Sequence, residues 1–458
     1  MTAAPRSPRR ARPDRPRRPV GAPTARSVAL EVIRRVTEHD AYSNLSLRSA
    51  LDRARLSARD AALATELVYG TLRRLVSLDD ALGRLVDRPL ASTPNQALGV
   101  LRLGAYQLLH TRIPPHAAVA ETVALAPDRQ RGFVNAVLRR LAVEPAAPPA
   151  GSTDAAVALR SGLAEWAVRE LRTLVPTEEV EAAAAALAER APVTLRVNTC
   201  RAGMDEVERR LAGVGAATER GRIHPASLLL TAGGAPTGLP GFAEGWFTVQ
   251  DQASCFVVAA LDPRPGGRVL DVCAGPGGKA GHAACLVEPN GVVVAADVSE
   301  ARLRLVRSTA ERLGAREVLL VQDGRRPAVR GGFDRVLVDA PCSGIGSARR
   351  RPELLWRARK ADVVGLSRLQ VGIATAAADL LAPGGRLVYS VCTFPRAETD
   401  AVCDALLRRR PDLEPEAIEG PDGQGERLRL WPHRHGCDAM FVAAFRRGDR
   451  RRPDLPRR

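Results

Sequence analysis

Two cysteines of this chain stand where a thiol can take part in a reaction. Cys342 lies in residues 339–344 (DAPCSG), three positions after Asp339, and Cys392 follows a short apolar run in residues 389–393 (YSVCT). Each segment is typical of the carboxyl end of a strand. If the two strands are neighbours in one sheet, the strands lie only about 5 Å apart. A cysteine is ordinarily a small buried apolar side chain, but two at adjacent strand ends, beside an acid, favour a reactive pair.

The chemistry that suits two such thiols is methylation of a pyrimidine at C5. C5 is a poor nucleophile, but addition of a thiolate to C6 makes it electron-rich enough to take a methyl group from a sulfonium. The C5 proton must then leave so that the thiol can be eliminated. A second thiol, and a carboxylate near N3 or N4 of the base, can serve those steps.

A candidate cofactor site lies in residues 269–279 (VLDVCAGPGGK). An apolar strand leads into a Gly-rich turn, and residues 280–286 are typical of a helix, which is how an open α/β sheet holds a nucleotide-like cofactor. Both phosphate-binding glycine fingerprints are absent. Asp271 at the strand end suits a cofactor with positive charge, such as S-adenosylmethionine (SAM). Lys279 is one of two lysines among 68 basic residues, which suggests that a compact ammonium is needed there.

Acidic residues end four successive predicted strands: Asp271, Asp297, Asp323 and Asp339. In a nucleoside-binding sheet, the place of Asp297 belongs to a carboxylate that binds the ribose hydroxyls. Asp323 can accept a hydrogen bond from an adenine amine. A lone Asp at a strand end is usually a helix cap, but four such residues together with the Gly-rich turn favour one binding site.

The elements that must position these residues alternate from residue 268 onward. We predict strands at 268–273, 291–297, 317–321, 334–339 and 385–391, helices near 299–313, 362–382 and 396–410, and late strands near 427–431 and 438–445. This order predicts a doubly wound, Rossmann-like α/β domain.

The rest of the chain predicts two further folded parts. Apolar residues at helical spacing between 25 and 141 predict an all-α domain, and mixed patterns predict a small α+β subdomain. The predicted divisions are a Pro/Arg-rich disordered tail (1–24), the helical domain (25–141), a linker (142–154), the α+β subdomain (155–262), the α/β domain (263–446) and a basic tail (447–458).

Composition limits the class of protein. The net charge is +17, and residues 1–26 and 446–458 supply +7 and +5 of it. Such tails fit salt-sensitive attraction to nucleic acid, although solvated arginine-rich tails are the plainer interpretation. The sequence has no run of about 20 apolar residues and no secretion signal. The eight cysteines form no C-x-x-C or His/Cys cluster, so we expect no metal site and reduced thiols in a cytoplasmic protein.

The helical domain resembles the antitermination factor NusB. The matching pieces are LVYGTLRR (67–74), LRLGAYQLL (101–109), IPPHAAVAETV (113–123) and GFVNAVLRRL (132–141). The resemblance implies RNA binding, and the candidate phosphate contacts are Arg73, Arg74, Arg139 and Arg140.

The C-terminal two-thirds resembles the RNA cytosine-C5 methyltransferases of the Sun/Fmu/Nop family. The motifs that carry the resemblance are 271–279, Asp297, 322–324 (QDG), 339–344, 389–393, 195–198 (LRVN) and 249–254 (VQDQAS). With the NusB-like domain in front, residues 25–446 resemble the RsmB-type bacterial enzymes, which methylate 16S rRNA. The fold expected is therefore a class I SAM-dependent methyltransferase domain after a NusB-like domain.

The resemblance implies a role for each matching residue. Cys392 is the expected nucleophile, Cys342 assists product release, and Asp339 contacts the base and the methyl donor. The expected SAM-binding residues are Cys273, Ala274, Gly275, Pro276, Gly277, Gly278, Lys279, Asp297, Asp323 and Asp339. The family usually has Thr where this chain has Val391 and Ile345.

The sequence therefore predicts a SAM-dependent methyltransferase, with SAM as cofactor, that acts on C5 of a cytidine in 16S rRNA as a monomer without metal. Three alternatives remain open at this point. They are the same chemistry on another RNA such as tRNA, a non-catalytic RNA-binding assembly factor, and a DNA cytosine methyltransferase with Cys342 as nucleophile.

Overall fold

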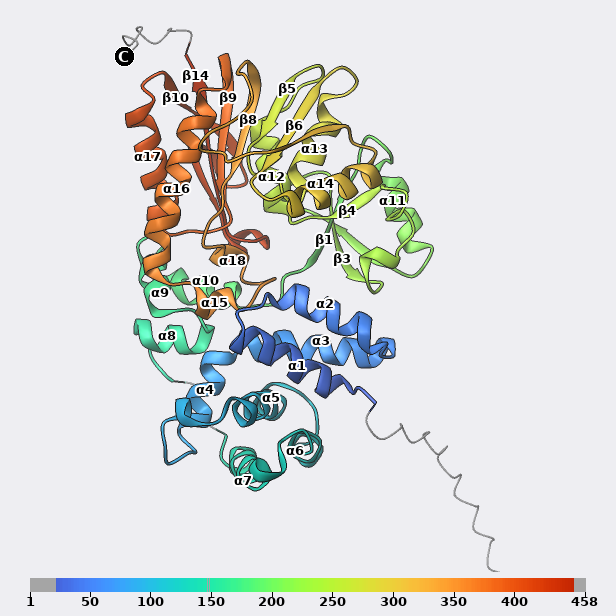
Figure 1. Ribbon diagram of the computed structural model, residues 1–458, viewed down its shortest axis with the longest axis vertical. Helices are drawn as coiled ribbons and strands as arrows, with labels where there is room; N and C mark the ends of the chain where they lie inside the picture. The colour runs from blue at the N-terminus through green and yellow to red at the C-terminus, as the bar shows by residue number, and fades with distance from the viewer. Residues whose placement is uncertain (1–21, 146, 148, 449–458) are drawn as a thin grey trace, which may run out of the picture. The chain divides into compact units, whose positions relative to one another are not determined.

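The computed structural model describes residues 22–145, 147 and 149–448, and the chain divides into two compact units (Figure 1). One unit comprises Met1–Thr71 and Ala91–Val143, and the other comprises Leu72–Leu90 and Glu144–Arg458. The second unit thus includes a segment from within the predicted helical domain. The two predicted tails fall almost entirely outside the described residues.

The first unit is helical in its described part, as predicted. Its helices are α1 (Ala25–Glu38), α2 (Ser43–Ala54), α3 (Ala58–Arg73, up to Thr71), α5 (Asn95–His110), α6 (Pro115–Val123) and α7 (Asp128–Val143). A 3-10 turn, η1 (Leu90–Ser92), precedes α5.

Small residues in the NusB-like motifs let these helices approach closely. A Cβ at Gly70 of α3 would lie 1.9 Å from the ring of Tyr106 on α5. One at Gly104 would lie 2.5 Å from the side chain of Leu138 on α7. Since such distances are impossible for real atoms, larger residues at these two positions would push the helices apart.

The second unit begins with helices and a small antiparallel sheet. The helices are α4 (Leu75–Gly83), α8 (Asp154–Ser161), α9 (Glu165–Arg172), η2 (Thr177–Glu179) and α10 (Val180–Leu187). The sheet has the order β2-β3-β1-β4. Its strands are β1 (Val193–Val197), β2 (Ala217–Arg220), β3 (Ser227–Ala232) and β4 (Phe247–Val249). The connections between them contain the helix α11 (Met204–Ala212) and the 3-10 turn η3 (Pro236–Gly238). This is the predicted α+β subdomain, although β2 was not expected.

The main sheet has the order β10-β14-β9-β8-β5-β6-β7. Its parallel strands are β5 (Arg268–Asp271), β6 (Val292–Asp297), β7 (Glu317–Val321), β8 (Phe333–Asp339) and β9 (Leu381–Val391). The antiparallel strands are β14 (Met440–Arg447), β10 (Leu413–Glu416) and β13 (Arg427–Leu430), which pairs with β14. Every predicted strand is present. Strand β10 was missed because Pro415 interrupts its pattern, which an edge strand tolerates.

Helices cover both faces of this sheet (Figure 1). One face packs against α12 (Gln252–Leu261), α13 (Gly278–Val287) and α14 (Glu300–Leu313), and the other against α16 (Lys360–Ala378) and α17 (Asp400–Arg409). Neighbouring residues such as Val269 and Leu270 enter opposite layers, so the central strands are apolar on both sides. The doubly wound prediction is confirmed.

Short elements complete the second unit. They are η4 (Ile345–Ser347), α15 (Leu354–Arg357), η5 (Arg396–Glu398), α18 (Pro432–His435) and the hairpin of β11 (Ile418–Gly420) and β12 (Gly423–Gly425). Helices α8 to α10 share one apolar cluster with Ile345, Phe394 and Trp431. The loops that follow β8 and β9 therefore rest on packed helices.

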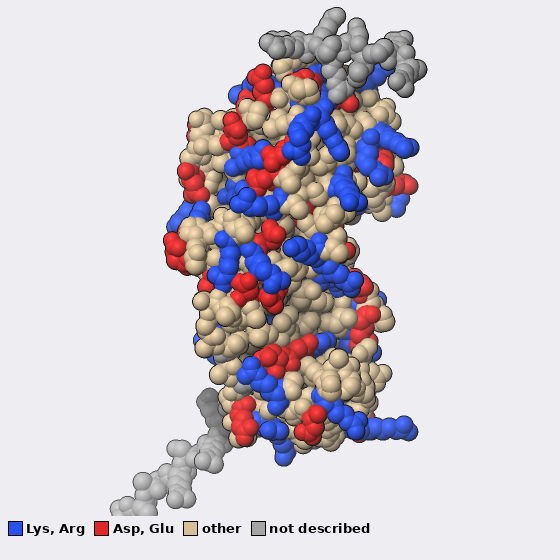
Figure 2. Space-filling view, turned by 90° about the vertical axis from the view of Figure 1, so that its left-hand side faces the viewer, with Lys and Arg blue, Asp and Glu red and all other residues tan. Residues whose placement is uncertain are grey.

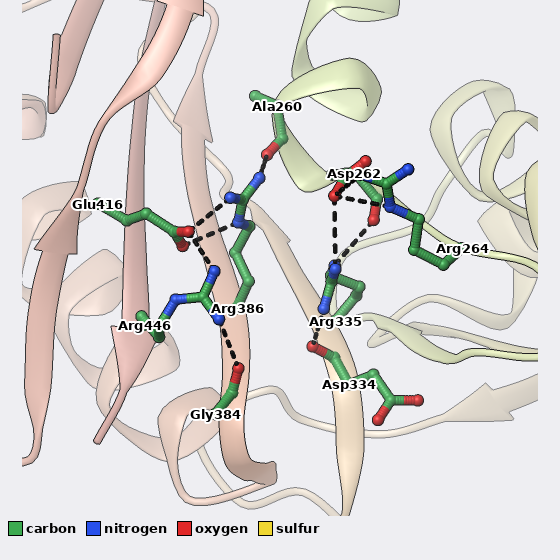
Figure 3. A network of polar contacts seen from close by, with 9 residues as sticks. All are labelled: Ala260, Asp262, Arg264, Asp334, Arg335, Gly384, Arg386, Glu416 and Arg446. Atoms are coloured by element: carbon green, nitrogen blue, oxygen red, sulfur yellow. Dashed lines mark hydrogen bonds and ion pairs between the residues drawn. The ribbon is translucent and has the colours of Figure 1, made fainter. Parts of the chain in front are cut away.

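Ion pairs hold the opposite end of the sheet, where β8 and β9 begin (Figure 3). The Arg386 guanidinium contacts Glu416 of β10 at 2.6 Å, and Arg446 of β14 also donates to that carboxylate. Arg335 of β8 donates to the backbone oxygen of Asp262 at 2.8 Å.

One prediction about the thiols is wrong. Cys200, just after β1, and Cys285, in α13, form a disulfide with their Cα atoms 6.0 Å apart. The two residues are separated by 85 positions, so no local spacing could reveal the pair. The other six cysteines are free, as expected.

The surface carries charges of both signs. Figure 2 shows arginines interspersed with carboxylates over the face in view. None of the helices in the described part of the chain combines the length and the apolar character needed to cross a membrane.

Candidate active site

The predicted cofactor turn connects β5 to α13 at the carboxyl edge of the main sheet. Gly277 has a φ of +105°, and a Cβ there would lie 2.9 Å from the Cα of Val306 in α14. Only glycine suits that backbone and that approach. The Gly275 amide donates to Asp297 Oδ2 at 3.0 Å, which ties the turn to the end of β6.

A cavity of about 260 Å³ opens beside this turn. The strand order reverses between β5 and β8, and doubly wound sheets bind ligands in the crevice at that point. The lining residues are Cys273, Ala274, Gly275, Pro276, Gly278 and Lys279 from the turn, and Val249, Gln250, Asp251, Ser254, Asp271, Asp339, Arg350 and Asp438 from elsewhere.

Two of the predicted acids meet at this cavity. Lys279 Nζ donates to Asp339 Oδ2 at 2.7 Å, and the Ser390 hydroxyl donates to Asp339 Oδ1 at 2.9 Å. Burial, and then the nearby Asp339, raises the pKa of Asp271 to about 7. Burial lowers the pKa of Lys279, but Asp339 more than offsets this, so the ammonium has a raised pKa. The Lys279 ammonium therefore stays charged among several acids of the site.

The other two predicted acids lie outside the lining of this cavity. Asp297 is buried, and its oxygens accept from the amides of Gly275 and Ser299. Asp323 follows β7 and pairs with Arg325 at 2.7 Å, and this arginine lowers the pKa of Asp323 to about 2. Asp297 thus contacts the cofactor turn. Asp323 follows β7, which is separated from β5 by β6 in the sheet.

The two predicted thiols lie together. Strands β8 and β9 are parallel neighbours, and Cys342 Sγ lies 3.5 Å from Cys392 Sγ. The contact between the two sulfurs raises the pKa of Cys342 and lowers that of Cys392. Burial raises the pKa of Cys342 further. Cys392 is thus the thiol of the pair that is better suited to ionise and to attack an electrophile.

The two departures from the family motif are both buried apolar residues. Val391 packs in the core layer on the α16 side, and Ile345 packs with α8 to α10. Neither side chain takes the place of a reacting group.

Three charged residues of the site were not predicted. Arg350 donates to Asp251 Oδ2 at 2.6 Å and to Asp438 Oδ2 at 3.0 Å, and the Asp438 amide donates to Asp251 Oδ1 at 3.1 Å. Burial, and then Asp251, raises the pKa of Asp438. Asp251 belongs to the VQDQAS segment, which was noticed only as a motif. Asp438 is the first residue of the strand predicted near 438–445, but nothing local shows that this strand begins beside the thiols.

The described residues contain no group of three or more His, Cys, Asp or Glu side chains that could hold a metal ion.

Family models match most of the chain. The model for 16S rRNA methyltransferase RsmB/F matches residues 258–446, and the NusB family model matches residues 23–143. A model for the ferredoxin-like domain of RsmF/B-like methyltransferases matches residues 163–235.

Curated relatives match over nearly their full length. A Mycobacterium tuberculosis protein named as a methyltransferase is 40% identical and covers 98% of this chain and 100% of its own. The ribosomal RNA small subunit methyltransferase B of Klebsiella pneumoniae is 37% identical over 88% of this chain and 93% of its own.

Solved structures agree with the fold. The crystal structure of the protein PH0851 has a TM-score of 0.78 and 25% identity, and covers 92% of this chain and 98% of its own. A methyltransferase homolog from Pyrococcus horikoshii has a TM-score of 0.56 and 29% identity, with 65% and 98% covered.

Proposed function

Since the chain belongs to the RsmB/F family of 16S rRNA methyltransferases, we propose that it methylates C5 of a cytidine in 16S rRNA through a covalent adduct between Cys392 and C6 of the base. The observation that carries this proposal is the thiol pair, 3.5 Å apart, at the ends of adjacent strands. This pair lies next to Asp339 and the cofactor turn.

The residues of the turn fit S-adenosylmethionine. The acids Asp271 and Asp339 line the cavity and favour a cationic amine and sulfonium. The amide nitrogen of Gln250 is buried without a partner in the described structure, so it has a donor available for a carboxylate. The methyl donor, when bound, supplies an electrophilic methyl group. We assign its binding to residues 273–279 and to Asp297, Asp323 and Asp339.

The thiols have different tasks in this reaction. The Cys392 thiolate adds to C6, and the electrons of the C5–C6 double bond then make C5 nucleophilic enough to take a methyl group. The C5 proton passes to a base, and the returning electrons expel Cys392 as a thiolate. Once Cys392 is bonded to carbon, it no longer carries the charge that opposes ionisation of Cys342. We therefore assign the removal of the C5 proton to Cys342.

We assign to Asp339 contacts with both the base and the methyl donor. Its carboxylate lies between Lys279 of the cofactor turn and Ser390, two residues before Cys392. A carboxylate near N3 or N4 of the base stabilises the charge that develops on the ring during addition.

The RNA partner is assigned from the family and from the NusB-like unit. The Klebsiella pneumoniae relative is named as a ribosomal RNA small subunit methyltransferase, and we carry that substrate over to this chain. We place the reaction in the cytoplasm.

The first test is transfer of labelled methyl groups from SAM to protein-free 16S rRNA. We expect 5-methylcytidine with the wild type, no product with Cys392→Ala, and a rate lowered about 10²-fold or more with Cys342→Ala. The Cys342→Ala variant should also retain RNA as a covalent adduct on a denaturing gel.

Other outcomes point to other functions. Loss of transfer only in Cys342→Ala would make Cys342 the nucleophile and overturn the assignment. Ordinary RNA binding without transfer by any variant would favour another RNA substrate or an assembly factor.

A further inference from the structure

We propose that Glu398 is a positioning residue that holds Cys342 and Cys392 side by side and keeps their shared proton on Cys342, so that Cys392 is the nucleophile. This inference rests on the proposed function. Glu398 lies in the turn η5, six residues after Cys392, and the predicted roles did not include it.

The Glu398 carboxylate is fully buried and has only donors around it. Its side chain has no exposed surface. Oε1 accepts from the Ser343 amide at 2.9 Å and from the Gln370 amide nitrogen at 3.0 Å, and Oε2 accepts from the Ser343 hydroxyl at 2.5 Å. These three hydrogen bonds hold the carboxylate in place, and its charge raises the pKa of Cys342. Among the described residues, no lysine or arginine forms an ion pair with it, so its charge is not neutralised locally.

These hydrogen bonds join the two loops that carry the thiols. Ser343 directly follows Cys342, and its hydroxyl also lies 2.7 Å from that of Thr393, which directly follows Cys392. The Tyr389 hydroxyl donates to the backbone oxygen of Glu398 at 2.7 Å. The loop after β8, the end of β9 and the turn η5 are therefore joined through Glu398 and Ser343, and we infer that this fixes the distance between the thiols.

The charges around the pair are asymmetric. Cys342 faces the carboxylates of Glu398 and Asp339, and both raise its pKa after the contributions of the Cys392 hydrogen bond and of burial. Cys392 faces Asp339 and Asp438 as well, but also the Lys279 ammonium, which favours the thiolate.

Tyr389 is a titratable neighbour of the pair and is a neutral phenol. Burial raises the pKa of Tyr389, so this side chain adds no charge. The Glu398 carboxylate raises the pKa of Cys342, so removing its charge should reduce the difference between the two thiols.

The test measures the two thiols separately and needs no RNA. Iodoacetamide reacts with thiolates, so the initial alkylation rate of each cysteine, read by peptide mass spectrometry from pH 5 to 10, reports its ionisation. In the wild type we expect Cys392 to react with the lower apparent pKa. In Glu398→Gln we expect the apparent pKa of Cys342 to fall by about one unit or more, because a nearby like charge is removed.

A matched control comes from the other end of the sheet. Glu416 is partly buried and is also hydrogen-bonded, but it pairs with Arg386 and Arg446 at the far end of the sheet (Figure 3). Glu416→Gln should leave both alkylation profiles unchanged.

Methyl transfer supplies a second readout. Glu398→Gln should lower the turnover number at least tenfold with little change in SAM affinity, whereas Ser343→Ala should lower turnover but keep the wild-type difference between the two thiols. The latter variant removes the hydroxyl link and retains the charge.

Two results would overturn the proposal. One is that, in the wild type, the apparent pKa of Cys342 is equal to or lower than that of Cys392. This result does not depend on whether any variant folds. The other is a folded, SAM-binding Glu398→Gln protein with unchanged thiol profiles. Failure of the proposed function looks different, because methyl transfer would then be absent from the wild type while the thiol profiles keep their asymmetry.

Discussion

At the scale of single residues, burial decides what each ionisable group can do. Burial raises the pKa values of Asp271 and Asp438 in the site. The same physics acts at Glu317, the first residue of β7, which has no assigned role in the reaction. Both of its carboxyl oxygens are buried without a hydrogen-bond partner in the described structure, and burial raises its pKa to about 8.

Replacing Glu317 should change how stability depends on pH. A carboxyl group with a raised pKa binds its proton more tightly in the folded state, so its contribution is present at low pH and is lost as pH rises toward about 8. We expect the wild type to lose up to about 1.4 kcal/mol of unfolding free energy per pH unit in this window relative to Glu317→Gln.

Urea unfolding of both proteins between pH 4.5 and 8.5 measures this slope. The exposed Glu311→Gln change on α14 is the control and should follow the wild type. Parallel curves for the wild type and Glu317→Gln would show that the buried carboxyl does not titrate as expected.

At the scale of elements, the carboxyl ends of β5, β8 and β9 bring the reacting groups together, and α13 carries the cofactor turn. The disulfide between Cys200 and Cys285 adds a covalent link from the loop after β1 to that helix. It connects the small sheet directly to an element of the active site.

Removing this link should destabilise the second unit. For a loop of 85 residues, chain entropy predicts a loss of about 4.6 kcal/mol in the Cys200→Ser/Cys285→Ser protein. A reducing agent should lower the thermal midpoint of the wild type but not that of the double variant. A thiol titration of the denatured, unreduced wild type should find six free thiols, and eight would contradict the disulfide.

At the scale of the whole molecule, the chain carries an excess of positive charge, most of which lies in the terminal segments and not in the body of the methyltransferase unit or of the NusB-like unit. The terminal residues 1–26 and 446–458 supply +7 and +5 of the net +17. Long-range attraction to RNA should therefore depend on these segments more than on the described body, where acids and arginines are interspersed (Figure 2).

Deleting residues 1–24 and 447–458 should weaken RNA binding mainly at low salt. Each lost phosphate contact reduces the slope of log K against log salt by about 0.7 to 0.9. Filter binding to 16S rRNA from 50 to 300 mM salt measures this slope, and methyl transfer at saturating RNA should persist. An unchanged slope would mean that the arginines of the tails do not contact RNA.

The sequence alone determined much of this protein. The order of strands and helices, the glycine turn at the end of β5 and the positions of Asp271, Asp339, Cys342 and Cys392 at strand ends are local features. They follow from apolar periodicity and from short motifs, which act over a few residues. The all-α character of the first unit was readable for the same reason.

Only the tertiary structure decided which side chains meet. The thiols are 50 positions apart, Ser343 and Glu398 are 55 apart, and Asp251 and Arg350 are 99 apart. The disulfide and the grouping of residues 72–90 with the second unit were equally hidden. Such contacts depend on which strands are neighbours, on their register and on the packing of helices against loops, and these are properties of the whole fold that no local pattern contains.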